Sequence, residues 1–464
     1  METPLGSYMW GTDTMVVFNL GNDGDVHAML LSRPNPGDWL AADLSAAARA
    51  PTKPVIPNPN EAQTLTGYPF IVLDQHGQPI EDTAHVVYLG LDGSLHELYA
   101  PGNTSNLQWT DRALPTAVRP LGGLPLTGAS PTTPLAGYPF VVYNSDFSLL
   151  ESTEHVIYLD INGSLRELWL KPGSDWRDNP LPTAGQPLVT GALTTPIAAY
   201  RFVNYYGGGG SAIESTEHVI YIDTNNRLHE LYHHAGAGSW IDHTLPGTPL
   251  VTEEVTTPLT AYTFFAAEND GTMTELSEHI IYIGMDGRLH ELYNVRQPNQ
   301  TGWIDHVLPA AAPLITPVQT TPLAGFSFFS ADMFYTSGGD FNTTSYDVHE
   351  CSQHVMYLDA DANLRELYLV RPGGPGWIDH ALPTAARPLF VPPSITGGPP
   401  AETTPLTGYS FVVNYDDGSL AESSLHVMYI DGDKNLHEMY LVRPGDGGWI
   451  DRNLTAQIGV KPAA

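Results

Sequence analysis

The sequence predicts an all-β protein, a seven-bladed β-propeller built from four-stranded antiparallel blades. Three observations lead to this prediction. One unit recurs seven times along the 464 residues, and each unit holds four short segments rich in β-branched and aromatic residues. Gly, Pro, Asn and Asp separate the segments, as expected for strands joined by tight turns. A repeat of four strands is the sequence signature of a propeller blade.

The repeat is clearest in the unit that starts at Thr194. Its first segment carries Tyr200, its second runs over residues 217–223, its third over 228–232, and its fourth begins at Trp240. The first aromatic recurs at Tyr8, Tyr68, Tyr138, Tyr200, Tyr262, Phe326 and Tyr409. The tryptophan recurs at Trp39, Trp109, Trp176, Trp240, Trp303, Trp377 and Trp449. Units start near residues 3, 64, 132, 194, 256, 320 and 403, and we expect residues 1–464 to form one propeller.

Closure into a ring is favoured over an open solenoid. An isolated four-stranded sheet leaves a face and two edges uncovered, and packing blades around an axis covers the faces and protects the edges. An open solenoid needs polar caps at both ends, and neither terminal unit resembles a cap. The first unit begins at Thr3 and the seventh ends near Leu454, so we expect the two ends of the chain to lie close together.

The connection between the second and third segments leaves two registers open. In the third unit it contains Asn162-Gly163, which supplies the positive φ of a tight hairpin. A three-residue connection ending in Gly163 pairs Ile157 with Glu167 and places His155 and Glu167 on one face. A two-residue turn shifts the register and sends them to opposite faces. Ala362 and Lys434, at the equivalent of Gly163, suit neither turn well.

The charge and the cysteine count exclude several classes of protein. The chain has 19 Lys and Arg against 51 Asp and Glu, a formal charge of −32, which disfavours nucleic acid and anionic lipid as partners. No apolar run approaches the ~20 residues that cross a bilayer. Cys351 is the only cysteine, so no intrachain disulfide is possible. We expect a cytoplasmic protein, or one released without a conventional signal peptide.

A histidine in the second segment and a glutamate twelve residues later form the strongest candidate site. The spacing is the same in six units: His85 and Glu97, His155 and Glu167, His218 and Glu230, His279 and Glu291, His354 and Glu366, His426 and Glu438. In the first unit Met15 takes the histidine position and Ala28, one inserted residue later, takes the glutamate position. A pair that shares one ligand is expected to disappear together. The alternative is a buried pair whose members bond only to each other.

Three further repeated residues have two interpretations each. The tryptophans are either apolar plugs between blades or aromatic plates that stack on sugars, and we count Trp109, Trp176, Trp240, Trp303, Trp377 and Trp449 as candidate ligand contacts. The aspartate that follows each of these tryptophans is expected to brace a turn or neighbouring strands. The basic residue before each glutamate, such as Arg166, is expected on the opposite face, solvated or salt-bridged.

These segments resemble the fucose-binding propeller lectins of the orange-peel mushroom type. Residues 154–160 and Leu165-Arg166-Glu167-Leu168-Trp169, followed by Trp176, are similar to two blade strands and the tryptophan segment of that family. The resemblance implies sugar pockets between blades, in which an arginine and a glutamate bond the hydroxyls and an aromatic packs on the apolar side. This chain differs in having histidine in place of the arginine and seven units instead of six.

The sequence therefore favours a multivalent carbohydrate-binding protein with up to six equivalent sites, no enzymatic activity, no metal and no cofactor. Its expected partners are glycans or glycoconjugates, with a fucose-like sugar implied by the resemblance, and its oligomeric state is left open. One alternative is a propeller enzyme or metal protein that uses the central channel or one specialised unit, such as the sixth, which carries an insertion between Met333 and Cys351. A protein-interaction scaffold is the other alternative.

Overall fold

The computed structural model describes most of the chain. Described are residues 5–10, 14–21, 23–32, 39–55, 64–74, 78–102, 108–122, 132–144, 148–190, 193–204, 214–236, 238–268, 273–295, 302–316, 319–334, 345–371, 374, 376–391, 402–414, 420–443 and 448–458. The glycine-rich segment 207–210 and much of the sixth unit's insertion lie outside these ranges. Within them, the predicted architecture is confirmed: seven four-stranded antiparallel sheets, each built from consecutive strands.

Each repeat forms one blade. Blade one is β1 (Leu5–Trp10), β2 (Thr14–Leu20), β3 (Val26–Ser32) and β4 (Leu40–Asp43), followed by helix α1 (Leu44–Ala48). Blade two is β5 (Leu65–Leu73), β6 (Pro79–Leu89), β7 (Leu95–Pro101) and β8 (Thr110–Ala113). Blade three is β9 (Leu135–Tyr143), β10 (Leu149–Leu159), β11 (Leu165–Leu170) and β12 (Arg177–Pro180). Blade four is β13 (Ala198–Asn204), β14 (Glu214–Ile222), β15 (Leu228–His234) and β16 (Ile241–Thr244).

The remaining blades follow the same order. Blade five is β17 (Thr260–Ala267), β18 (Met273–Ile283), β19 (Leu289–Val295) and β20 (Ile304–Val307), followed by the small pair β21 (Ile315–Thr316) and β22 (Gln319–Thr320). Blade six is β23 (Ala324–Phe334), β24 (Ser345–Leu358), β25 (Leu364–Arg371) and β26 (Ile378–Ala381), followed by β27 (Phe390–Val391) and β28 (Glu402–Thr403). Blade seven is β29 (Thr407–Asn414), β30 (Leu420–Ile430), β31 (Leu436–Arg443) and β32 (Ile450–Asn453), followed by helix α2 (Leu454–Ile458).

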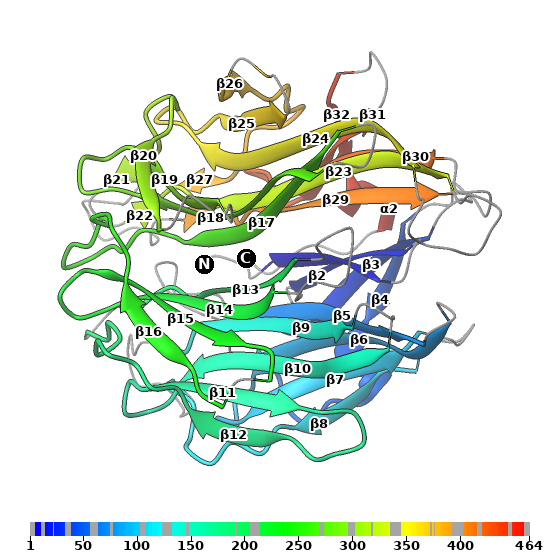
Figure 1. The fold of residues 1–464 in the computed structure, drawn as a ribbon, viewed down its shortest axis with the longest axis vertical. Helices are drawn as coiled ribbons and strands as arrows, with labels where there is room; N and C mark the ends of the chain where they lie inside the picture. The colour runs from blue at the N-terminus through cyan, green and yellow to red at the C-terminus, as the bar shows by residue number, and fades with distance from the viewer. Residues whose placement is uncertain are drawn as a thin grey trace.

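The first strands of the blades form a closed ring. Strand β1 contacts β5, and the contacts continue through β9, β13, β17, β23 and β29 back to β1. In Figure 1 the colour passes once around this ring, so that blue blade one lies next to orange-red blade seven. Because each first strand touches two neighbours of the same kind, these strands lie nearest the axis. The fourth strand of each blade, at the opposite edge of the sheet, lies outermost.

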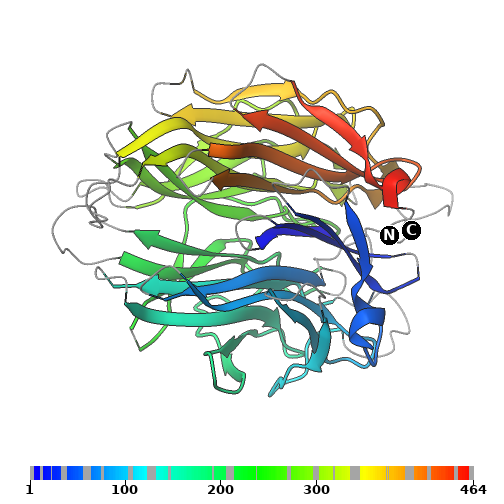
Figure 2. The ribbon, with the colours of Figure 1, turned by 90° about the vertical axis from the view of Figure 1, so that its right-hand side faces the viewer.

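Among the described residues, side-chain contacts close the ring, since the first and last sheets share no strand. One hydrophobic cluster joins Leu5, Met15 and Trp39 of blade one to residues of blade seven and to Leu454 of α2. The hydroxyls of Ser7 and Thr407 are 2.7 Å apart across the same boundary. Figure 2 shows blade one beside blade seven and α2. The expectation that the two ends of the repeat array meet is therefore confirmed.

The hairpin between strands two and three takes the three-residue register. Ile157 pairs with Glu167, as the connection ending in Gly163 requires. The residue equivalent to Gly163 has positive φ in all six units that carry a His/Glu pair. This holds even where it is not glycine: Asn226 (58°), Ala362 (60°) and Lys434 (62°) adopt a positive φ. The amide of Ala362 donates to the carbonyl of Asp359 at 2.8 Å, and Asp359 Oδ1 accepts the amide of Asn363 at 2.9 Å. The aspartate side chain thus stabilises the turn and offsets the backbone strain.

Helices contribute little to the described part of the chain. Both are five residues long. Among the described residues, no helix is both long enough and apolar enough to span a bilayer.

Candidate functional site

Six His/Glu pairs lie at the boundaries between blades. Because Ile157 pairs with Glu167, the side chains two residues apart across the hairpin share a face, and the same register holds in the other five units. Nδ1 of each histidine is 2.7–2.9 Å from Oε1 of its glutamate. The structure therefore brings each predicted pair together, and every member, taken as a whole residue with its backbone, is at most 5% exposed.

The histidine ring is held on every side by the protein. Its Nε2 is 2.6–2.8 Å from a Thr or Ser hydroxyl two residues earlier. The first aromatic of the same blade stacks on it, with ring centroids 4.7–5.3 Å apart. Both ring nitrogens are thus engaged inside the blade. The histidine lies behind the glutamate and fixes its orientation.

Burial and the neighbouring charges shift the pKa values in these pairs in opposite directions. Burial alone would lower the pKa of His155 and His218, but the neighbouring glutamates outweigh it and raise the pKa values to about 8 and about 9. Burial alone would raise the pKa of Glu230, but hydrogen bonds from His218 and His243 outweigh it and lower the pKa to about 2. The His218–Glu230 pair is therefore ionic: an imidazolium holds a carboxylate.

The second oxygen of the glutamate faces the next blade. Nε1 of the following blade's tryptophan donates to Oε2: Trp240 to Glu167 at 3.3 Å, Trp303 to Glu230 at 3.0 Å, Trp449 to Glu366 at 3.0 Å, and Trp39 to Glu438 at 3.2 Å. The tryptophan partner thus comes from the neighbouring unit. Trp39 was missed as a candidate because the sequence does not show which unit supplies the partner. Trp109, Trp176 and Trp377 lie in or against hydrophobic clusters at other blade boundaries, as the apolar-plug interpretation predicts.

A polar residue on the outermost strand completes this arrangement. Oε2 of Glu230 is 2.8 Å from Nε2 of His243, and that of Glu366 is 3.1 Å from Nε2 of His380. The side chains of His243 and His380 are 40% and 37% exposed. At blade two Arg112 takes the same position and donates to Glu97. Sequence reasoning missed these residues, although a basic residue recurs directly after the Trp-Ile-Asp motif. These partly exposed residues cover Oε2 of the glutamate, which therefore lies just beneath the protein surface.

The first unit is apolar at the same place, and the structure corrects which residue stands for the histidine. Tyr8 pairs with Val16, as Tyr68 pairs with His85, and Phe18 pairs with Ala28. Val16 therefore occupies the histidine position with the usual spacing and no insertion, so the prediction of Met15 was wrong. Strand pairing decides this, because every nearby residue is apolar and gives the sequence no marker.

Two polar groups at the boundary of blades one and two have no bonds, because Ala28 and Ala84 stand where other boundaries have acids. Tyr8 Oη and Trp109 Nε1 are buried and have no hydrogen-bond partner among the described residues. Both belong to the cluster that contains Val16 and Ala28. At the boundary of blades three and four the equivalent groups bond to glutamates: Tyr138 donates to Glu217 at 3.0 Å and Trp240 donates to Glu167 at 3.3 Å. This boundary is a natural variant of the site from which the polar groups have been removed.

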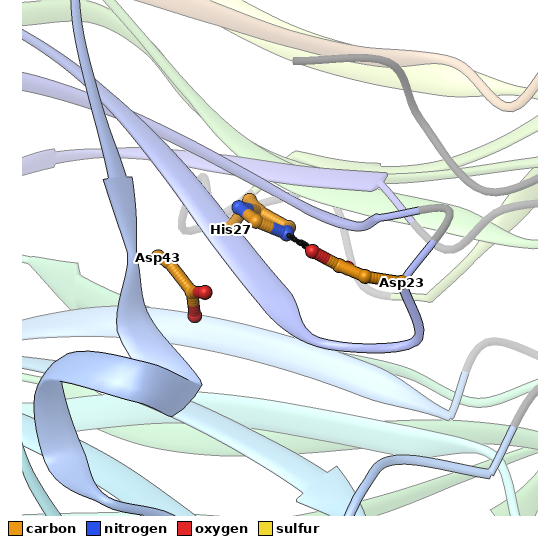
Figure 3. Close-up of side chains that lie close together, drawn as sticks. All are labelled: Asp23, His27 and Asp43. Carbon is orange, nitrogen blue, oxygen red and sulfur yellow. Dashed lines mark hydrogen bonds and ion pairs between the residues drawn. The ribbon is translucent and has the colours of Figure 1, made fainter.

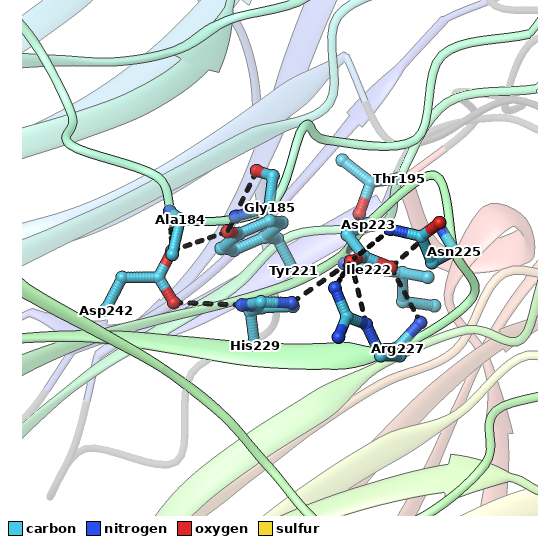
Figure 4. A network of polar contacts seen from close by, with 10 residues as sticks. All are labelled: Ala184, Gly185, Thr195, Tyr221, Ile222, Asp223, Asn225, Arg227, His229 and Asp242. Atoms are coloured by element: carbon cyan, nitrogen blue, oxygen red, sulfur yellow. Dashed lines mark hydrogen bonds and ion pairs between the residues drawn. The ribbon is translucent and has the colours of Figure 1, made fainter.

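The opposite face of each blade carries a separate bracing network (Figure 4). Asp242 accepts a hydrogen bond from Tyr221 at 2.6 Å, and its other oxygen is 2.9 Å from Nδ1 of His229. Nε2 of His229 is 3.2 Å from the turn residue Asp223. Arg166 makes the equivalent bond to Asp178 at 2.8 Å. The prediction that these aspartates are braces and that the basic residues are salt-bridged on the other face is confirmed.

In blade one, His27 occupies the position that His229 and Arg166 occupy in the other blades (Figure 3). His27 Nε2 lies 2.9 and 3.0 Å from the two carboxylate oxygens of Asp23. Asp43 lies close to His27 and Asp23. Its carboxylate accepts a hydrogen bond from the amide of Ala46 at 2.8 Å and caps helix α1. Its carboxylate is thus already used by the helix.

Comparisons with known proteins identify the fold. No family model matches the chain, and no curated protein matches it. Among solved structures it is similar to the BP39L lectin from Burkholderia pseudomallei, with 17% identity and a TM-score of 0.58, covering 97% of this chain and 99% of that one. This chain therefore shares its fold with BP39L over nearly the whole length of both chains.

Two further solved structures align more loosely. The fucose-specific lectin from Aleuria aurantia has 14% identity and a TM-score of 0.43, with 86% of this chain and 95% of that one covered. A polysaccharide lyase, an ulvan lyase bound to a sugar chain, has 11% identity and a TM-score of 0.43, covering 99% and 97%.

Proposed function

We propose that this protein is a carbohydrate-binding protein, a lectin without enzymatic activity, that takes sugars at the boundaries between neighbouring blades. The observation that carries the proposal is the repeated pairing of a glutamate Oε2 with the next blade's tryptophan Nε1, described at four boundaries. A carboxylate acceptor beside an indole donor matches the two hydrogen-bonding roles of a sugar hydroxyl. The indole face offers an apolar surface for the C–H side of the ring.

In this proposal the residues of the site have different roles. The glutamate and the tryptophan contact the sugar, and the exposed strand-four residue, such as His243, lies at the rim. The histidine, whose ring nitrogens are engaged inside the blade, keeps the glutamate charged and oriented. A fucose-like sugar is the first candidate because of the sequence resemblance, and the lectin fold shared with BP39L supports carbohydrate as the ligand class.

Repetition supports a multivalent mode of binding. Up to six boundaries carry a glutamate, while the boundary of blades one and two, with Val16 and Ala28, should stay empty. Several weak sites on one rigid ring would bind a glycosylated surface far more tightly than one site does. An enzyme instead needs one asymmetric constellation, and the strongly divergent unit has lost its polar groups.

The test compares two tryptophans at the same position of the repeat, one that bonds a glutamate and one that does not. Trp303→Phe keeps an aromatic plate but removes the N–H that bonds Glu230, whereas Trp109→Phe removes an N–H that has no bonding partner among the described residues. After a glycan array has identified the sugar, calorimetry should give one site fewer for Trp303→Phe and an unchanged stoichiometry for Trp109→Phe. An array without a hit, or equal stoichiometry in both variants, would refute the proposal.

A further inference from the structure

A third acidic residue reaches some of the His/Glu pairs from the next blade. It is the residue directly before the next histidine, so its side chain points the other way, toward the preceding blade. At the boundary of blades three and four this residue is Glu217, whose Oε2 lies 3.4 Å from Nδ1 of His155. The same Nδ1 is 2.9 Å from Oε1 of Glu167. Two carboxylates thus converge on one ring nitrogen.

The geometry of this group fits a tetrahedral metal ion. A zinc ion with bonds near 2.0–2.1 Å separates its ligand atoms by about 3.3 Å. The distances from His155 Nδ1, 2.9 and 3.4 Å, lie on either side of that value, and the three ligand atoms all lie within 4.8 Å of one another. The side chains are 6%, 7% and 2% exposed, so water does not compete for them.

The surrounding bonds are those of a second shell. A metal at Nδ1 requires the imidazole proton to be on Nε2, and Thr153 Oγ1 is 2.7 Å from Nε2, in place to accept it. Tyr138 donates to Glu217 Oε2 at 3.0 Å, and Trp240 donates to Glu167 Oε2 at 3.3 Å. Each ligand side chain is therefore oriented by a further hydrogen bond.

The boundary of blades three and four differs from the preceding one in the charges that surround the acids. At blades two and three the equivalent group (His85, Glu97, Glu154) already contains the guanidinium of Arg112, bonded to Glu97. At blade three Asn179 stands opposite Glu167 instead of an arginine. Two buried carboxylates there face one imidazole, with the half-buried His233 3.6 Å from Glu217, and a divalent ion would neutralise both acids.

The next boundary differs in geometry, and the one after it in composition. At blades four and five His218 bridges the two acids, with Nδ1 2.7 Å from Glu230 and Nε2 2.9 Å from Glu278. Its acids lie at opposite nitrogens and do not converge on one. At blades five and six Gln353 replaces the acid. We propose that His155 Nδ1, Glu167 Oε1 and Glu217 Oε2 bind one divalent transition-metal ion, zinc by preference, which links blades three and four.

Metal content of the full-length protein tests the proposal without reference to any sugar. The protein, produced in zinc-supplemented medium and washed with chelator, should retain one zinc per chain by elemental mass spectrometry. Glu217→Gln should reduce zinc at least tenfold, and Gln353 shows that this fold accepts glutamine at the position. The matched control Glu154→Gln, beside Arg112, should keep the full equivalent.

Cobalt provides a second readout that does not depend on a variant. Cobalt bound in the zinc position should give the visible absorption bands of a tetrahedral site with nitrogen and oxygen ligands, and Glu217→Gln should abolish them. Wild-type protein without zinc or cobalt binding would overturn the proposal, and would leave a protonated His155 between two acids. Equal zinc in wild type and Glu217→Gln would also overturn it, and would assign the metal to another group such as Asp23 and His27.

Discussion

Removing one glutamate should cost more stability than removing the whole polar pair. Glu366 is 2.7 Å from His354 Nδ1 and accepts from Trp449 Nε1 at 3.0 Å, and its Oε2 is 3.1 Å from His380 Nε2. In Glu366→Ala the partly exposed His380 can turn to water, but the buried His354 ring and the indole N–H lose their acceptor. Breaking a buried ion pair in this way costs about 3–5 kcal/mol of unfolding free energy.

The matched variant follows from blade one. The double variant His354→Val, Glu366→Ala reproduces the residues that Val16 and Ala28 supply there, and Leu425 of the next blade adds no third acid, so this group keeps no buried charge. Replacing both partners by apolar groups costs far less than orphaning one of them. We expect the double variant to recover about 1–3 kcal/mol relative to Glu366→Ala, a coupling that residues in contact commonly show.

Chemical denaturation, followed by tryptophan fluorescence and circular dichroism together, measures both variants. Coincident transitions by the two probes would justify a two-state treatment for this large ring. Additive losses, with the double variant less stable than Glu366→Ala, would refute the reasoning that His354 and Glu366 satisfy each other. Loss of the sugar stoichiometry at this boundary in Glu366→Ala would in addition support the proposed contact to sugar.

Two further predictions concern the tryptophans and the response to acid. Trp109 is 5% exposed, whereas Trp240 is only partly buried, so Trp109→Ala should lose about 3–5 kcal/mol and Trp240→Ala clearly less, as equilibrium unfolding would show; equal losses would contradict this order. Burial alone would raise the pKa of Glu366, but bonds from His354 and His380 lower it to about 2, so its contribution is present above pH 4.5 and is lost as the pH falls toward 2, on the order of 2–3 kcal/mol. Burial alone would lower the pKa of His437, but Asp451 and Asp431 raise it, so its contribution is present below pH 6.5 and is lost as the pH rises through the raised value. Unfolding midpoints from pH 2 to 9 measure both slopes, and Glu366→Gln should flatten the acid side; an unchanged acid slope in that variant would count against the assignment.

The sequence alone was enough to predict the architecture. Seven copies of four β-rich segments, most of them with Asp-Gly or Asn-Gly between the second and third segments, specify the strands and the hairpins through local preferences. The constant spacing of twelve residues between histidine and glutamate marked the pair, and the covariation in blade one indicated that its members act together. These features are local or repeated, and the sequence displays them directly.

The register of the hairpin needed the structure. Asn162-Gly163 is compatible with two connections, and only the pairing of Ile157 with Glu167 shows that His155 and Glu167 share a face. The choice follows from burial across the whole sheet, because a shift of one residue would turn every core side chain outward. Blade one shows the same dependence, since only strand pairing distinguishes Val16 from Met15 as the equivalent of the histidine.

The contacts between blades were decided entirely by tertiary structure. Trp39 and Glu438 are 399 positions apart in the sequence, yet they form one hydrogen bond because the ring closes there. The residue before each histidine changes from Ala84 to Glu154, Glu217, Glu278, Gln353 and Leu425, so it carries no repeat signal. Only the packing of one twisted sheet against the next determines which histidine it faces. The sequence alone therefore determined the blades, and the packing between blades determined how the site is completed.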